Sequence, residues 1–103
     1  MIYHVVTAAD WQKAVQTAGP GGQGFYEAAS LALEGFIHTS KKEQVAGVLE
    51  RYYAGQSDLL LLHIDETKLT ALLQYELAPS VNEMFPHIYG PLNIDAVTTI
   101  ENL

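Results

Sequence analysis

Hydrophobic and polar residues follow first a strand period and then a helix period at the start of the chain. Residues Ile2–Val6 are β-branched or aromatic and alternate between two faces, which predicts a short strand. Thr7 and Asp10 form a weak capping-box pattern that opens a helix over about 8–17. The apolar face expected for this helix consists of Trp11, Ala14, Val15 and Ala18.

A glycine-rich stretch and an ambiguous segment follow this helix. Residues 19–24 contain four glycines and one proline, which predicts a flexible connector or lid. The stretch has neither the lysine nor the strand–loop–helix context of a phosphate-binding P-loop. Residues 25–33 show no clear period, and we expect a short helix capped near Ser30 and ended by Gly35.

The stretch Glu34–Ser40 organises the rest of the pattern. Residues 36–38 predict a strand that carries His38 to its end, and two hydroxyl residues lead from it towards a helix. Ser40 with Glu43 predicts a capping box at the start of that helix. Its apolar side chains recur at helical spacing and are Val45, Val48, Leu49, Tyr52 and Tyr53.

The second half of the chain reads mainly as strands. Residues Leu59–Ile64 are apolar at almost every position, which predicts a central strand covered on both faces. Further strands are expected over 72–77, 85–91 and 96–100. With no internal repeat or linker, residues 1–103 predict a single α+β domain.

Composition and charge exclude several classes of function. The chain has no cysteine, so disulfides and thiolate metal sites are excluded. Its formal net charge of −7 leaves too few cations to build a nucleic-acid-binding face. It shows neither an apolar run long enough to span a membrane nor a signal peptide at its start. A cytoplasmic protein with a small-molecule partner is the resulting expectation.

The histidines are the main candidates for chemistry. None of the four is spaced from another as compact metal ligands are, which argues against a metal site. His63 lies within a leucine run and is read as structural. His4, His38 and His87 lie beside hydroxyl or aromatic residues at strand positions, where a neutral imidazole can bind a ligand or transfer a proton.

Two further readings concern hydroxyls, lysines and carboxylates. Thr39, Ser40 and Lys41 lie at the predicted start of a helix, where lysines are unfavourable because this end of the helix dipole is positive. An anion bound there by the free amides and the lysines would offset this repulsion. The alternative is that the lysines are simply solvated. No nucleophile-elbow motif is present, and no spacing selects a pair of carboxylates, so neither a nucleophilic triad nor glycosidase chemistry is indicated.

Five segments in order resemble a bacterial family known as domain of unknown function 952. They are 3–7, 30–31 together with 34–40, 43–45, 58–65 and 85–92. The resemblance covers nearly the whole chain and implies a compact ADP-ribosyltransferase-like fold. Such a fold has two small packed β-sheets, two main helices and a central cleft.

The resemblance also implies roles for single residues. His4 matches the first-strand histidine that hydrogen-bonds the ribose of NAD in those transferases, and 38–40 lie near the nicotinamide pocket. His87 stands where the catalytic glutamate is expected. An imidazole cannot stabilise an oxocarbenium-like transition state as a carboxylate does. Related RNA 2′-phosphotransferases also lack the glutamate but use arginines, of which this chain has one.

We therefore expect a histidine-lined cleft that binds a nucleotide-like or phosphorylated small ligand, with NAD a candidate cofactor. The expected catalytic residues are His38 and His87. The expected ligand-binding residues are His4, Thr7, Thr39, Ser40, Lys41 and Tyr89. Whether the protein is an enzyme stays open, since the alternative is a noncatalytic interaction or regulatory domain. A histidine-ligated metal hydrolase is a third reading.

Overall fold

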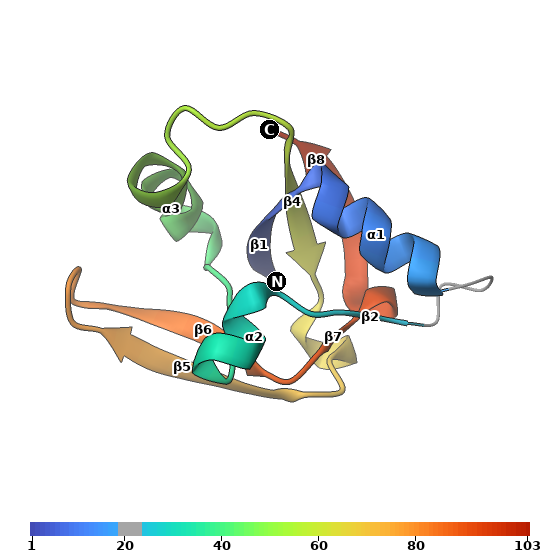
Figure 1. Ribbon diagram of the computed structural model, residues 1–103. Helices are drawn as coiled ribbons and strands as arrows, with labels where there is room; N and C mark the ends of the chain where they lie inside the picture. Colours follow the sequence, from blue (N-terminus) through green and yellow to red (C-terminus); the bar gives the residue numbers. More distant parts are fainter. Residues whose placement is uncertain (19–23) are drawn as a thin grey trace.

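The computed structural model describes residues 1–18 and 24–103 and shows a mixed α+β arrangement (Figure 1). The helices are α1 Ala8–Ala18, α2 Ala29–Glu34 and α3 Val45–Tyr52. The strands are β1 Ile2–Thr7, β2 Phe25–Tyr26, β3 Ile37–His38, β4 Leu59–Ile64, β5 Leu72–Ala78, β6 Glu83–Tyr89, β7 Leu92–Asn93 and β8 Val97–Asn102. The predicted 19–24 loop lies, except for Gly24, outside the described residues.

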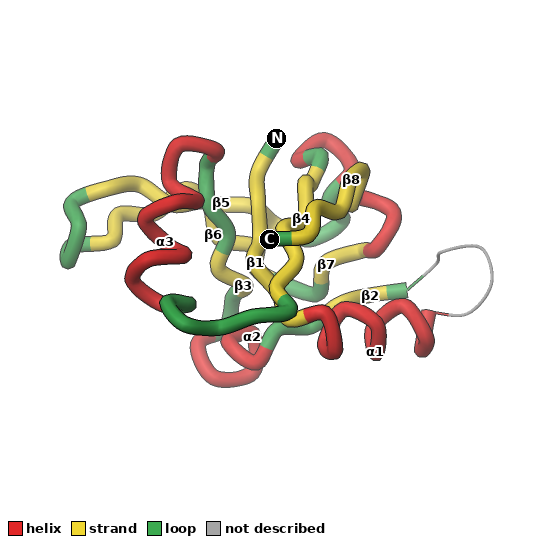
Figure 2. The backbone as a smooth tube through the Cα atoms, turned by 90° about the horizontal axis from the view of Figure 1, so that it is seen from above, coloured by secondary structure: helices red, strands yellow, loops and turns green. Residues whose placement is uncertain are grey.

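The strands form small antiparallel sheets. The first sheet has the order β1–β4–β8, the second has the order β3–β6–β5, and β2 pairs with β7. A backbone bridge between Tyr3 and Ser40 joins the first sheet to the segment that follows β3. Seen from above, α3 and the β5–β6 hairpin lie at one end of the molecule and α1 at the other (Figure 2).

The strands β1 and β4 of the first sheet are covered on both faces, as the apolar run of β4 predicts, whereas β8 is largely exposed. On one face Ile2, Leu62 and Ile64 join the main hydrophobic core. On the other face a second group of strand side chains packs against α3, and its buried members are Tyr3, Val5, Leu59 and Leu61. Strict alternation along β1 therefore sends neighbouring residues to opposite cores and places His4 on the main-core side.

Most predicted elements are confirmed, and the differences have local causes. The Ser40–Glu43 capping box is wrong, because the Ser40 backbone pairs with Tyr3 and the helix starts one residue later. A 3₁₀ turn over Lys42–Gln44 leads into α3, and the Gln44 side chain accepts a hydrogen bond from the Lys41 amide at 2.9 Å.

Two other differences concern the segments around α1 and α2. Val15 is 44% exposed, so α1 packs through Trp11 and Ala14 rather than through the full predicted face. The segment 25–33 holds the unpredicted strand β2 as well as α2, which starts before Ser30. Gly35 does end α2, in the left-handed conformation with φ of 89°.

Candidate functional site

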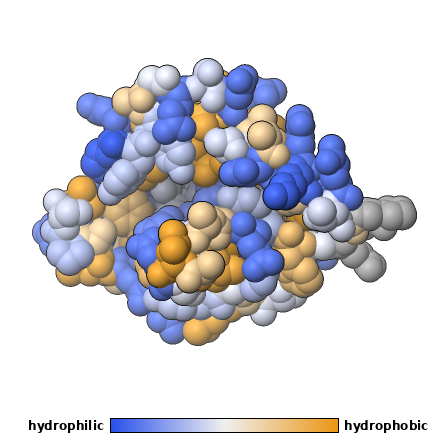
Figure 3. All heavy atoms as spheres, viewed as in Figure 1, coloured by the Kyte–Doolittle hydropathy of each residue, from blue (hydrophilic) through white to orange (hydrophobic). Residues whose placement is uncertain are grey.

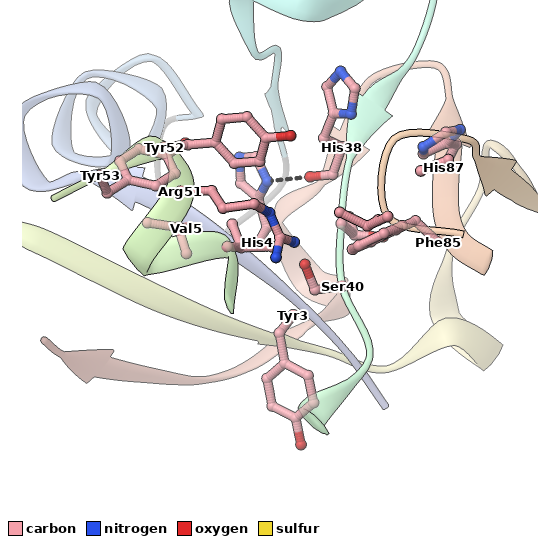
Figure 4. A pocket seen from close by; sticks show the side chains of 14 residues that line it. Tyr3, His4, Val5, His38, Ser40, Arg51, Tyr52, Tyr53, Phe85 and His87 are labelled. Atoms are coloured by element: carbon pink, nitrogen blue, oxygen red, sulfur yellow. Dashed lines mark hydrogen bonds between the residues drawn. The ribbon is translucent and has the colours of Figure 1, made fainter. Parts of the chain in front are cut away.

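A cavity of about 480 Å³ lies between β1, α3 and the second sheet (Figure 4). Its walls are largely apolar or aromatic and include Tyr52 and Tyr53 from α3 and Phe85 from β6. The space-filling view shows the surface hollowed between the part that contains α3 and the hairpin below it (Figure 3). A cavity of this size suits a small molecule, because ligand pockets commonly occupy roughly 300–1,000 Å³.

Arg51 brings a positive charge into this cavity. It comes from the last turn of α3 and extends towards the middle of the cavity in Figure 4. The side chain folds back over Gly47, where an added Cβ would lie 2.9 Å from Nη1. Within residues 1–18 and 24–103, no carboxylate lies at ion-pair distance from its guanidinium. The only arginine of the chain is thus available to an anionic ligand.

Ser40 supplies a hydroxyl to the same cavity. Its backbone amide and carbonyl are both bonded to Tyr3 at 2.8 Å, which fixes the residue against β1. The residue is only 7% exposed, and its hydroxyl points into the cavity towards the Arg51 side in Figure 4. Among the described residues this hydroxyl has no hydrogen-bond partner, and no fully buried side-chain oxygen there lacks one, so the hydroxyl is accessible to solvent. A water or a ligand in the cavity can bond to it.

His4 is buried and bonded at both ring nitrogens. Nδ1 lies 2.6 Å from the His38 carbonyl oxygen, which can only accept, so Nδ1 carries a proton. Nε2 lies 3.1 Å from the Tyr26 hydroxyl and accepts from it. Burial lowers the pKa of His4 to about 4, against the opposing effect of the carbonyl bond. Burial also raises the pKa of Tyr26 above its usual range. His4 is therefore neutral at pH 7 with both nitrogens occupied.

His38 and His87 are direct cross-strand partners at the rim of the cavity. They face each other in the β3–β6 register, and their ring centroids are 5.3 Å apart in an edge-to-face arrangement. Each ring has its own carboxylate: His38 Nε2 lies 2.9 Å from Glu34, and His87 Nδ1 lies 2.7 Å from Glu76. The His38 side chain is 56% exposed and the His87 side chain only 11% exposed. His87 is thus the more rigidly held of the two.

Glu76 connects His87 to Tyr89. The Tyr89 hydroxyl donates to Oε1 of Glu76, the same oxygen that accepts from His87. The hydrogen bond from Tyr89 has the largest effect in lowering the pKa of Glu76, and the hydrogen bond from His87 lowers it further. The same carboxylate raises the pKa of the Tyr89 phenol. Glu76 is thus held as an ionised carboxylate behind the His87 ring.

The remaining predicted residues are engaged within the protein. Thr7 Oγ1 accepts from the Asp10 amide and caps α1, away from the cavity. Thr39 lines the cavity, but its hydroxyl and its amide both donate to the Pro86 carbonyl. The Lys41 amide donates to Gln44. Few amides at the start of this helix are therefore available to an anion, and the positive charge in the cavity comes from Arg51 instead.

Sequence reasoning missed the residues that the second sheet and α3 add. Tyr52 was assigned to the apolar face of its helix, yet it is 64% exposed and stands at the cavity wall. Glu76 was one of several carboxylates with no spacing to select it. Arg51 was considered only as one of the few cations of the chain, which are too few for a nucleic-acid-binding face, and as its one arginine. Its position one turn after Gly47 and three residues after Val48 is the one available signal that it shares a helix face with the cavity.

A family model described as a protein of unknown function, DUF952, matches residues 5–100. The chain belongs to this family. The solved structures of protein CC0527 from Caulobacter crescentus share this fold across 99% of the chain. Its crystal structure is 30% identical with a TM-score of 0.83, and the chain covers 84% of it. Its solution NMR structure has 31% sequence identity to this chain and a TM-score of 0.79, and the chain covers 83% of it. No curated protein matches the chain.

Two negative findings apply to residues 1–18 and 24–103 of this DUF952 member. No helix there is both long and apolar enough to cross a membrane. Nor do three histidine or carboxylate side chains in that part of the chain converge as ligands for a metal ion.

Proposed function

We propose that the cavity binds a small phosphorylated ligand of nucleotide size. The observation that carries this proposal is that the Arg51 guanidinium and the Ser40 hydroxyl enter one cavity, where neither forms a side-chain hydrogen bond or an ion pair within residues 1–18 and 24–103. A guanidinium binds phosphate oxygens through charge-assisted hydrogen bonds, and a hydroxyl adds a further donor. The chain has a net charge of −7, and its one arginine forms no ion pair in the part of the chain that the structure describes, so it is well suited to recruit an anion.

The aromatic walls support a ligand with a flat ring. Tyr52 and Tyr53 lie on one side of the cavity and Phe85 on the other. Aromatic side chains stack on the faces of nucleobases without strong base preference. A phosphate near Arg51 and a ring between these side chains would together fill a cavity of about 480 Å³.

We further propose that the fold is ADP-ribosyltransferase-like and that NAD is a candidate ligand. Two small packed sheets with a cavity between β1 and the second sheet support the likeness. A ribose contact by His4 would require Nε2 to exchange its bond to Tyr26 for one to the ligand. Glu76 lies beside His87, so a carboxylate stands near the position where the transferases carry their glutamate.

Isothermal calorimetry and amide NMR titration with AMP, ADP-ribose, NAD and inorganic phosphate test the proposal. We expect binding at millimolar or lower concentration, with shifts at Ser40, Arg51 and Tyr52. Arg51→Gln should weaken binding about 10- to 100-fold, the effect of losing a charge-assisted hydrogen bond. Lys68→Gln removes the same charge on a 3₁₀ turn away from the cavity and should leave binding unchanged. If none of the four compounds shifts these residues, the proposal fails.

The alternative function is a noncatalytic interaction or regulatory domain. The β5–β6 hairpin favours it, because Tyr75, Leu77 and Met84 are each between 43% and 53% exposed on this element. Exposed apolar residues gathered on one hairpin are typical of contact surfaces. Failure of every ligand to bind, with the fold intact, would favour this alternative.

A further inference from the structure

His87 is held so that only one of its ring nitrogens can exchange a proton. The ring stacks on Phe36 with centroids 4.1 Å apart and an interplanar angle of 19°. Nδ1 lies 2.7 Å from Glu76, and the side chain is nearly buried. Because a carboxylate only accepts hydrogen bonds, Nδ1 carries a proton whether the ring is neutral or charged. Proton exchange by His87 therefore takes place at Nε2.

The Nε2 atom is accessible to solvent. Among the described residues it has no hydrogen-bond partner, and no fully buried side-chain nitrogen or oxygen of this part of the chain lacks one. His87 is also one of the residues that line the cavity. A water or a ligand hydroxyl can therefore reach Nε2.

Glu76 is itself fixed from a second direction by Tyr89. Tyr89 donates to the oxygen that also binds His87, so the carboxylate, the phenol and the imidazole form one chain of hydrogen bonds. Such chains hold an imidazole in one tautomer and stabilise it when it gains a proton. The other groups facing His87 are Phe36 and the His38 ring, which is bonded to Glu34.

We propose that His87 is the general base of a phosphoester hydrolysis in this cavity and that Glu76 is its positioning residue. The inference rests on the proposed function, in which Arg51 holds the phosphate. Nε2 of His87 takes a proton from a water, and the water oxygen forms a bond to phosphorus. The bond between phosphorus and the ester oxygen breaks, and the departing alkoxide takes a proton from solvent. His87 then returns its proton to solvent.

Arg51 lines the same cavity as His87. It is a long, exposed side chain that rests on Gly47 and makes no ion pair within the described residues. In Figure 4 its guanidinium lies in the middle of the cavity, and Phe85 lies between it and His87. The reaction therefore requires the flexible guanidinium to pass Phe85 with the phosphate, so that it neutralises the charge that develops as the water attacks.

The test measures binding and turnover separately, with bis(p-nitrophenyl) phosphate, 2′,3′-cyclic AMP and AMP as probes. We expect the wild-type protein to hydrolyse at least one of them. His87→Gln should lower kcat about 100-fold or more, the usual range for a lost general base, with affinity for the probe kept. Glu76→Gln should also lower kcat with affinity for the probe kept, because an uncharged amide stabilises the protonated imidazole formed in the step less than a carboxylate does.

A matched control is present in the chain. His63 forms a similar pair with Glu101 at 2.7 Å on the first sheet and does not line the cavity. His63→Gln should leave both turnover and affinity for the probe unchanged. Urea unfolding of each variant verifies that it is folded, and Glu76→Gln supplies a second variant should His87→Gln not fold.

The outcomes separate the two proposals. If the probes bind and wild-type protein hydrolyses none of them, the general-base role is overturned and the binding function stands. If His87→Gln keeps wild-type kcat, or if Glu76→Gln keeps it or loses affinity instead, the assigned roles are overturned while the hydrolysis stands. If no probe binds, the proposed function fails and this inference fails with it.

Discussion

Acid should destabilise this protein through His4 before most carboxylates are protonated. The His4 imidazole is buried between the His38 carbonyl and the Tyr26 hydroxyl, and its pKa is lowered to about 4. In the unfolded chain the same group has its ordinary pKa of 6.5. Between these two values the unfolded state binds a proton that the folded state does not.

The size and the sign of the effect follow from proton linkage. The free energy of unfolding should fall as pH falls, by up to about 1.4 kcal/mol for each pH unit below 6.5. The total lost by the time pH reaches about 4 is about 3 kcal/mol. Above pH 6.5 the ring is neutral in both states, so His4 contributes no pH dependence there.

Urea unfolding at several values of pH between 8 and 4 measures this effect, with His4→Gln as the comparison. Glutamine can donate to the His38 carbonyl and accept from Tyr26 but cannot gain a proton. Because other groups titrate alike in both proteins, the difference between their free energies of unfolding isolates His4. We expect the wild type to lose about 3 kcal/mol relative to the variant by pH 4. Parallel curves for the two proteins would refute the reasoning.

Three further predictions concern stability and are measured by urea unfolding at pH 7.5. Tyr26→Phe leaves His4 Nε2 without its donor and should cost about 1–3 kcal/mol; no loss would mean that water replaces the hydroxyl. Leu62→Ala empties a fully buried position of β4 and should cost about 2–5 kcal/mol, whereas a loss below 1 kcal/mol would contradict the packing. Gly47→Ala should raise stability by about 0.5–1 kcal/mol and displace only the flexible end of Arg51; a loss of stability would show that this end cannot move.

The fold was predictable where a periodic pattern of hydrophobic residues extends over a whole strand or helix. The strand β4 and the helix α3 carry apolar patterns long enough to give their type, which is confirmed. The predicted face of α3 is confirmed in part, since Val45, Leu49 and Tyr53 pack on the second core while Tyr52 is exposed. The strands β2 and β7 have two residues each, too few for any period to show. Ser40 has the residue type of a helix cap, but its backbone is bonded to Tyr3 instead. A tertiary contact decided that position against local preference.

The site was predictable in part, through residue type. His4, His38, Ser40 and His87 were singled out because imidazoles and hydroxyls at strand ends suit chemistry, and all four line one cavity. Nothing local shows that both nitrogens of His4 are occupied by groups from other elements. The charge at the site was assigned to the start of a helix, while the cavity receives it from Arg51 near the end of that helix.

The sequence by itself determined the α+β class, the main strands and helices and the excess of negative charge, and it singled out the stretch 34–40 as a candidate site. Only the tertiary structure decided which partners those groups meet. Residues 38 and 87 became neighbours through the β3–β6 register, and Glu76 reached His87 from β5. The reason is physical: apolar periodicity is a local property of the chain, whereas hydrogen bonds between side chains depend on which strands come to lie side by side.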